Sequence, residues 1–156
     1  MRKNTKIQKR ILQPDYKYNN PVVTKLINYM MLEGKKSVAT KVVYDAFDIM
    51  AQKTKKDPLD VFDEAIKNIS PSLEVKSKRV GGANYQVPMP VRGDRRIMLA
   101  MRWIRDSARA KTGKSTAETL AAELIDAANN TGDAIKKKEN TERMAHANRA
   151  FAHFAR

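Results

Sequence analysis

The chain has 156 residues and carries 31 Lys and Arg against 17 Asp and Glu, so its formal net charge is +14. A chain of this length builds one domain with a buried core and is too short for two ordinary domains. The charge indicates a polyanionic partner, and nucleic acid is favoured over a membrane because no apolar run approaches the roughly 18 residues of a membrane-spanning helix. Cysteine is absent, which excludes disulfides and thiolate metal ligands.

The first eighteen residues are predicted to form a basic arm. Five cations precede the first acidic residue, Asp15. These cations are Arg2, Lys3, Lys6, Lys9 and Arg10. Few large apolar side chains accompany them, so the segment cannot bury enough surface to offset the entropy of ordering it. We expect a flexible arm over about residues 1–18 that becomes ordered on a polyanion, and an ordinary frayed terminus is the alternative.

Three amphipathic helices are expected to follow the arm. Asn20 stands before a proline and is a good N-cap for the first, and Gly34 is expected to end it. Lys35 and Lys36 then lie in a tight turn, and Ser37 is expected to cap the second helix. An Asp-Pro pair farther along repeats the cap and begins the third helix. All three carry apolar residues at the 3.6-residue spacing of a helix with one buried face.

Residues 73–91 alternate with period two and are predicted to form a two-stranded antiparallel β-ribbon. Gly81 and Gly82 supply the positive φ angles of a two-residue hairpin turn. Pro88 and Pro90 lie two apart, so their missing N–H groups fall on the same edge. No third strand can easily pair with that edge, and the sheet is expected to end there as a ribbon.

An isolated ribbon is only marginally stable in water, so this one needs helices at its base or a ligand along its length. Lys76, Lys78 and Arg79 on the first strand indicate a negatively charged ligand. Tyr85 lies opposite Lys78 if the turn contains only the two glycines. Stacking on an unpaired base and packing within the protein are both open for this tyrosine.

Asp94 is expected to cap a fourth helix with one cationic face. Arg95, Arg102, Arg105 and Arg109 fall within an arc of about 80° at 100° per residue. The opposite face is apolar and is expected to pack into the core.

Two further helices are expected after a short turn. Ser115 and Glu118 have the spacing of a capping box that begins the fifth helix. The last helical stretch follows three consecutive lysines and carries Met144, Phe151 and Phe154 at helical spacing. The predicted fold is mainly α, with about six helices in one bundle-like domain and a protruding two-stranded antiparallel β-ribbon. The helical body is expected over residues 19–156.

No catalytic residues, metal site or cofactor are expected. The Gly-Lys-Ser string at 113–115 resembles the end of a phosphate-binding loop, but Ala108 stands where that loop needs a glycine. His146 and His153 have no ligand spacing that would hold zinc. Trp103 lies at helical spacing and is assigned to the core or its edge. A small-molecule substrate is not expected.

Several motifs carry a family resemblance. They are Asp15-Tyr16-Lys17-Tyr18, the turn at 33–37, the ribbon string at 74–88, Arg95-Arg96, Arg102-Trp103, Arg143-Met144-Ala145, Asn148 and the string at 150–153. Together, from about residue 6 to the end, they resemble the bacterial small-subunit ribosomal protein seven family. The resemblance implies a helical body with a β-ribbon that binds the 3′ major domain of small-subunit ribosomal RNA.

The same resemblance implies nucleation of the subunit head and a place beside the path of messenger RNA and exit-site tRNA. The implied setting is the cytoplasmic ribosome of a bacterium, where the chain is a monomer that neighbours other small-subunit ribosomal proteins.

Charge and resemblance together predict two sets of site residues. The RNA-binding set is Arg2, Lys3, Lys6, Lys9, Arg10, Lys35, Lys36, Lys76, Lys78, Arg79, Arg92, Arg95, Arg96, Arg102, Arg109, Lys111 and Lys114. The set on the tRNA or mRNA side is Gly81, Gly82, Tyr85, Arg143, Arg149 and His153. Two alternatives are an architectural DNA-binding protein that lays a basic ribbon in the minor groove and a protein scaffold. A scaffold as the sole role is disfavoured because protein interfaces are depleted in lysine.

Overall fold

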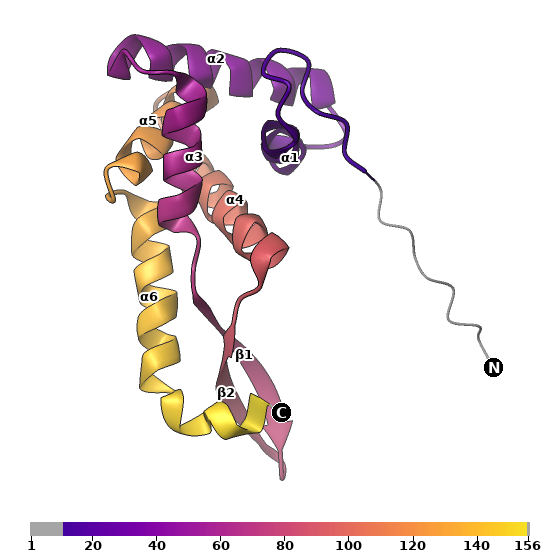
Figure 1. Cartoon of the computed structure of the whole chain (residues 1–156), viewed down its shortest axis with the longest axis vertical. Coiled ribbons are helices and arrows are strands. Elements are labelled where there is room, and N and C mark those ends of the chain that lie inside the picture. Colours follow the sequence, from indigo (N-terminus) through magenta and orange to yellow (C-terminus); the bar gives the residue numbers. More distant parts are fainter. Residues whose placement is uncertain (1–10, 156) are drawn as a thin grey trace, which may run out of the picture.

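The computed structural model describes residues 11–155 and confirms a mainly α fold with a two-stranded ribbon (Figure 1). The elements in chain order are α1 (Pro21–Met30), α2 (Lys36–Thr54), α3 (Pro58–Ile69), β1 (Leu73–Val80), β2 (Ala83–Pro90), α4 (Gly93–Ala110), α5 (Thr116–Ala128), α6 (Asp133–Ala147) and the 3₁₀-helix η1 (Arg149–Ala155). Helices α1 to α5 gather at one end, the ribbon protrudes at the other, and α6 runs alongside from the body toward it. None of the described helices is long and apolar enough to cross a membrane.

Three helices begin at the caps that the sequence predicts. The side chain of Asn20 accepts a hydrogen bond of 2.8 Å from the amide of Val22 at the start of α1. Asp57 caps α3 in the same way. Ser115 and Glu118 form both bonds of a capping box at the start of α5. These side chains satisfy amides that the first helical turn leaves without a partner.

Three other predicted boundaries are wrong. Ser37 and Asp94 lie inside the first turns of α2 and α4, and neither helix has a capping side chain. Asp94 still places a negative charge near the positive end of the α4 dipole. Helix α1 ends before Met31, whose backbone is extended, whereas Gly34 lies in the following turn with φ at +72°. The glycine therefore serves the turn and does not end the helix.

The C-terminal stretch is not one continuous helix as the sequence predicts. Helix α6 ends at Ala147, and the side-chain amide of Asn148 donates to the carbonyl of Met144 (2.8 Å) where the chain turns into η1. The three lysines at 136–138 lie within α6 and do not precede it. Met144 is exposed, and Ala145 fills the buried position in this turn. The predicted apolar face of one continuous helix is therefore wrong, because Phe151 and Phe154 lie in η1 and Met144 does not pack.

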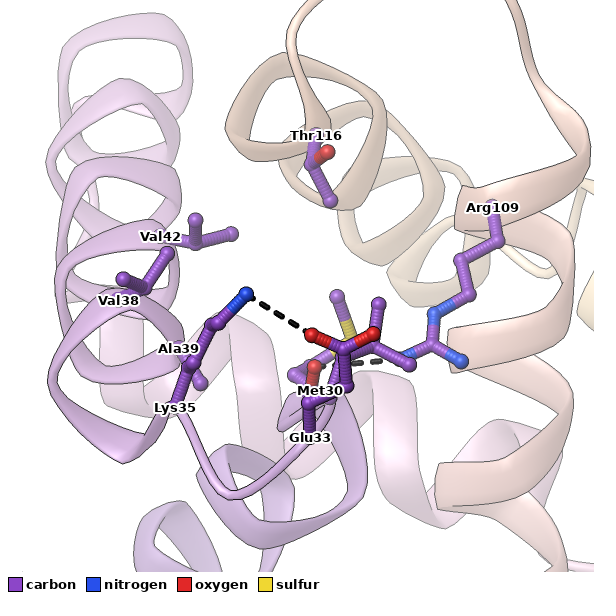
Figure 2. A pocket seen from close by; sticks show the side chains of 9 residues that line it. Met30, Glu33, Lys35, Val38, Ala39, Val42, Arg109 and Thr116 are labelled. Carbon is purple, nitrogen blue, oxygen red and sulfur yellow. Dashed lines mark hydrogen bonds and ion pairs between the residues drawn. The ribbon is translucent and has the colours of Figure 1, made fainter.

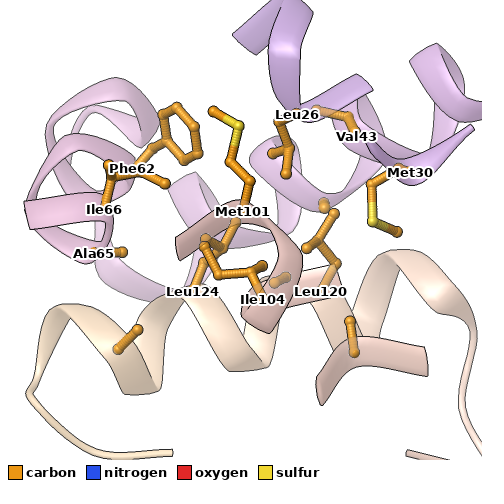
Figure 3. Close-up of a cluster of buried hydrophobic side chains, with 14 of the residues drawn as sticks. Leu26, Met30, Val43, Phe62, Ala65, Ile66, Met101, Ile104, Leu120 and Leu124 are labelled. Carbon is orange, nitrogen blue, oxygen red and sulfur yellow. The ribbon is translucent and has the colours of Figure 1, made fainter. Parts of the chain in front are cut away.

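The hydrophobic core lies among α1, α2, α3, α4 and α5 (Figure 3), and Ala134 and Ile135 at the start of α6 extend it. Its largest fully buried side chains from these helices are Leu26, Phe47, Met50, Phe62, Ile69, Met101, Ile104, Leu120 and Leu124. Buried alanines along α5 allow α2, α3 and α4 to pack closely around it. Trp103 is half-buried against this core, as predicted.

Gln13, Asp15 and Tyr18 contact α1 or α2, although the predicted arm extends to residue 18. The carboxylate of Asp15 is buried and accepts a hydrogen bond of 2.7 Å from the hydroxyl of Tyr44. The ring of Tyr18 lies 5.2 Å from that of Phe47, between centroids. This part of the expected arm is thus a loop fixed to the body. The five cations predicted for the arm, Arg2, Lys3, Lys6, Lys9 and Arg10, lie outside the described residues.

Candidate nucleic-acid interface

The ribbon has the geometry that the sequence predicts. Strands β1 and β2 pair antiparallel around a two-residue turn, with Gly81 at φ +56° and Gly82 at φ +88°. In such a hairpin every second pair counted from the turn exchanges hydrogen bonds, which leaves Pro88 and Pro90 at the pairs that do not. Their missing N–H groups therefore face outward, and no third strand joins the sheet within residues 11–155.

One face of the ribbon is covered by the C-terminal segment of the same chain. Lys78 and Tyr85 are directly opposite each other, so their side chains share this face. The Tyr85 ring lies 5.1 Å from the rings of both Phe151 and Phe154 in η1, between centroids. The ammonium of Lys78 donates to the carbonyl of Phe154 at 2.7 Å. Of the two possibilities open for Tyr85, packing within the protein is the one observed.

A buried carboxylate joins the ribbon base to α4. Glu74 on β1 accepts hydrogen bonds from two nitrogens of Arg95, at 3.0 and 3.3 Å, and pairs with Lys76 at 3.2 Å. Burial alone raises the pKa of Glu74, but the bonds from Arg95 and Lys76 outweigh it and lower that pKa. Arg95, which the sequence assigns to RNA, thus joins the ribbon to α4, whereas Lys76 pairs with Glu74 within β1.

A second buried carboxylate joins the α4–α5 turn to α6. Glu123 is fully buried, accepts a hydrogen bond of 2.8 Å from the amide of Ala134 and pairs with Lys111 at 2.6 Å. Sequence reasoning missed this carboxylate because Glu123 looks like a residue on an exposed helix face. Glu123 lies three residues after Leu120 and four before Ala127, so it shares their buried face of α5. This spacing is the signal that could have revealed it.

A groove lies between the α1–α2 turn, α2, the end of α4 and the start of α5 (Figure 2). It has a volume of about 390 Å³. Val38 and Val42 form one side and Thr116 and Arg109 the other, with Lys35 at the turn. No pattern in the sequence indicates this groove, because its lining comes from four separate elements. Across the described part of the chain, no cluster of His, Asp or Glu residues could hold a metal ion.

The sequence of the chain matches that of known proteins. The model of a family described as Ribosomal protein S7p/S5e matches residues 1–149. The chain belongs to the ribosomal protein S7p/S5e family.

Its relatives in this family include small ribosomal subunit proteins uS7 from three bacteria. The Moorella thermoacetica protein is 57% identical over 99% of both chains, and the Chloroflexus aggregans protein is 58% identical over 96% of both. The Clostridium novyi protein is 60% identical over 94% of both. The predicted family resemblance is confirmed. Membership of a ribosomal protein family also agrees with the prediction that the chain is not an enzyme.

The predicted site residues of this S7p/S5e chain fall into two structural groups. The first group is held by the protein itself and comprises Lys35, Lys76, Lys78, Arg95, Arg96, Arg109 and Lys111. Arg96 donates to the carbonyl of Pro71 at 3.1 Å, and Arg109 donates to that of Met30 at 3.2 Å. Lys35 pairs with Glu33 at 2.8 Å, but both side chains are well exposed, so this pair is easily exchanged for another.

The second group is exposed to solvent. Its cations are Lys36, Arg79, Arg92, Arg102, Lys114, Arg143 and Arg149. Their side chains have no hydrogen bond or ion pair with any residue between 11 and 155. His153 is exposed as well, 2.9 Å from the carbonyl of Ala150. The cations of the second group can therefore bind a partner without breaking a contact that stabilises the fold.

Proposed function

We propose that the chain is a constituent of the small ribosomal subunit that binds the 3′ major domain of its RNA and nucleates assembly of the head. The relatives named above, which are small ribosomal subunit proteins, support this assignment. Its setting is the bacterial cytoplasmic ribosome, where the chain acts as a monomer beside ribosomal RNA and neighbouring small-subunit proteins.

The observation that carries the RNA-binding proposal is the protruding ribbon with exposed cations at its tip and base. Arg79 lies near the tip, on the face opposite Lys78. Arg92 lies at the base of the ribbon, between β2 and α4, and Arg102 lies within α4. An RNA duplex exposes phosphates and shape more than base edges, because its major groove is too narrow for side chains. A thin cationic ribbon suits contact with several phosphates of a folded RNA.

We further propose that the ribbon tip and the C-terminal segment face the path of messenger RNA and exit-site tRNA. Gly81 and Gly82 form that tip, and η1 packs on β2 beside it. Arg143, Arg149 and His153 are exposed on α6 and η1. Because the two segments pack together, one ligand can contact both of them.

The test is a salt titration of the affinity for the isolated 3′ domain RNA, beside an unrelated structured RNA and a bent DNA duplex. Each phosphate contact contributes roughly 0.7 to 0.9 to the slope of log affinity against log salt. Arg79→Gln and Arg102→Gln are each expected to lower that slope by about 0.7 to 0.9. Lys56→Gln is the matched control, since Lys56 is an exposed cation in the α2–α3 turn, at the opposite end of the molecule from the ribbon.

Each outcome of this titration decides between functions. Preference for the ribosomal domain, with slope changes in the ribbon and α4 variants but not in Lys56→Gln, supports the proposal. Equal affinity for all three ligands would reduce it to general polyanion binding. Preference for the bent duplex would favour the architectural DNA-binding alternative.

A further inference from the structure

The groove at the α1–α2 turn has the form of a binding site distinct from the ribbon. Its volume of about 390 Å³ falls in the range of roughly 300 to 1,000 Å³ typical of small-molecule sites. Met30 and Ala39 are buried and form its floor. Leu32 is 60% exposed and Val38 is 58% exposed at its sides. Large apolar side chains that stay exposed around a hollow indicate a ligand with an apolar surface.

The mouth of the groove is cationic. Lys35 and Arg109 line it, and the one acidic residue in the lining, Glu33, pairs with Lys35 on the exposed turn. Within residues 11–155 the guanidinium of Arg109 has a single hydrogen bond, to the Met30 carbonyl, and an arginine has five N–H donors. Lys36, the next residue, is exposed at the start of α2 and lies outside the lining itself. The ligand therefore combines an apolar body with negative charge.

We propose that this groove takes one unpaired nucleobase of the bound RNA, with the adjoining phosphate held at the mouth by Lys35 and Lys36. The inference rests on the proposed RNA-binding function and names a particular structural feature of that RNA. An unstacked base has apolar faces, and Figure 2 shows Val38 and the aliphatic part of Arg109 on opposite sides of the groove, where they can contact such faces. A phosphate alone would gain nothing from the exposed apolar walls. An apolar side chain of a protein partner would carry no negative charge to pair with the lysines, and protein interfaces are depleted in lysine.

Two kinds of variant separate a base contact from a phosphate contact. Leu32→Ser combined with Val38→Ser removes apolar surface and leaves every charge in place. We expect a loss of affinity for the 3′ domain RNA of roughly tenfold, with an unchanged salt slope. Lys36→Gln is expected to lower the slope by about 0.7 to 0.9, because it removes one phosphate contact. Met144→Ser is the matched control, since Met144 is a similarly exposed apolar side chain on α6.

Cross-linking locates the contact directly. The chain has no cysteine, so a single introduced thiol carries the only photoreactive group. Val38→Cys and Thr116→Cys face the groove from α2 and α5. Both are expected to cross-link to the same unpaired nucleotide, mapped by primer extension on the RNA. Glu64→Cys is the control, because residue 64 is exposed on α3, a helix outside the groove.

The outcomes distinguish this inference from the proposed function. If the wild-type chain does not prefer the ribosomal domain, the proposed function fails. If the wild type binds, but the double serine variant binds equally well, the groove does not hold a base and only this inference fails. Cross-links from Val38→Cys that spread over paired nucleotides, or that reach no RNA at all, would also overturn it. The circular dichroism of every variant is compared with wild type to confirm that it folds.

Discussion

Replacement of Lys111 by methionine should destabilise the protein more than it weakens RNA binding. The ammonium of Lys111 lies 2.6 Å from the carboxylate of Glu123, which is fully buried. Methionine keeps the length of the aliphatic chain and removes the charge. Among the described residues, the variant therefore leaves Glu123 with one hydrogen bond, from the amide of Ala134.

The size of the effect follows from the burial of the two partners. Removal of one partner from a fully buried ion pair costs about 3 to 5 kcal/mol. The side chain of Lys111 is 32% exposed, so solvent screens part of the interaction, and Glu123 keeps a backbone donor. We expect a loss of about 2 to 3 kcal/mol, which lowers Tm by roughly 5 to 10 °C in a domain of this size.

The dependence of this effect on pH has a definite sign. Burial lowers the pKa of Lys111, but the hydrogen bond and charge of Glu123 raise it by more, so that pKa lies above its usual 10.5. A raised lysine pKa stabilises the folded state below the pKa of the unfolded chain, and this contribution is lost as pH rises through the folded value. The difference in stability between wild type and Lys111→Met should therefore narrow above pH 10.5.

Thermal and urea unfolding, together with the RNA salt titration, test this reasoning. Lys114→Met is the matched control, because Lys114 is exposed three residues farther along and is also predicted to bind RNA. It should change the free energy of unfolding by less than about 0.5 kcal/mol. A Lys111→Met variant as stable as wild type, with a reduced salt slope, would show that Lys111 binds phosphate and that its pair with Glu123 contributes little.

Three further predictions concern the ribbon and its neighbours. Glu142 accepts hydrogen bonds from the amide and the hydroxyl of Ser72, and these bonds outweigh the effect of burial and lower its pKa. Glu142→Ala should therefore lower the free energy of unfolding at pH 7, measured in urea, by about 1 kcal/mol. That difference should narrow as pH falls below 4.5, the usual pKa of this carboxyl, and a constant difference down to pH 3 would contradict the assignment. Gly81→Val should destabilise the ribbon by about 1 to 2 kcal/mol, because Gly81 has a positive φ that valine disfavours, although space for a side chain is open. Gly81→Asn should be tolerated, because asparagine adopts such a φ more readily. Hydrogen exchange of the strand amides compares the two variants. Tyr85→Ala should speed hydrogen exchange in residues 149–155 and lower the free energy of unfolding by no more than about 1.5 kcal/mol, and protection equal to wild type would show that other contacts hold η1.

Elements that depend on near neighbours in the chain were predicted well. Helix starts at Asn20 and Ser115 need only a side chain two or three residues before the amide that it caps. The ribbon turn needs only two glycines between alternating segments. The predicted continuation of α6 was wrong because the end of this helix does not depend on near neighbours. Apolar spacing continues through Asn148, and the chain turns there because η1 packs on the ribbon.

The sequence by itself determined the positive charge, the amphipathic helices, the two-glycine turn and the proline edge that ends the sheet, because each depends on composition or on residues a few positions apart. Only the tertiary structure decided which cations are left for a partner. Lys78 meets a carbonyl 76 residues away, and Arg109 meets one 79 residues away, whereas Arg79 stays exposed. The groove beside Lys35 likewise exists only because four elements converge on it. A list of lysines and arginines predicts affinity for a polyanion, but burial and pairing in the folded chain decide where that polyanion can bind.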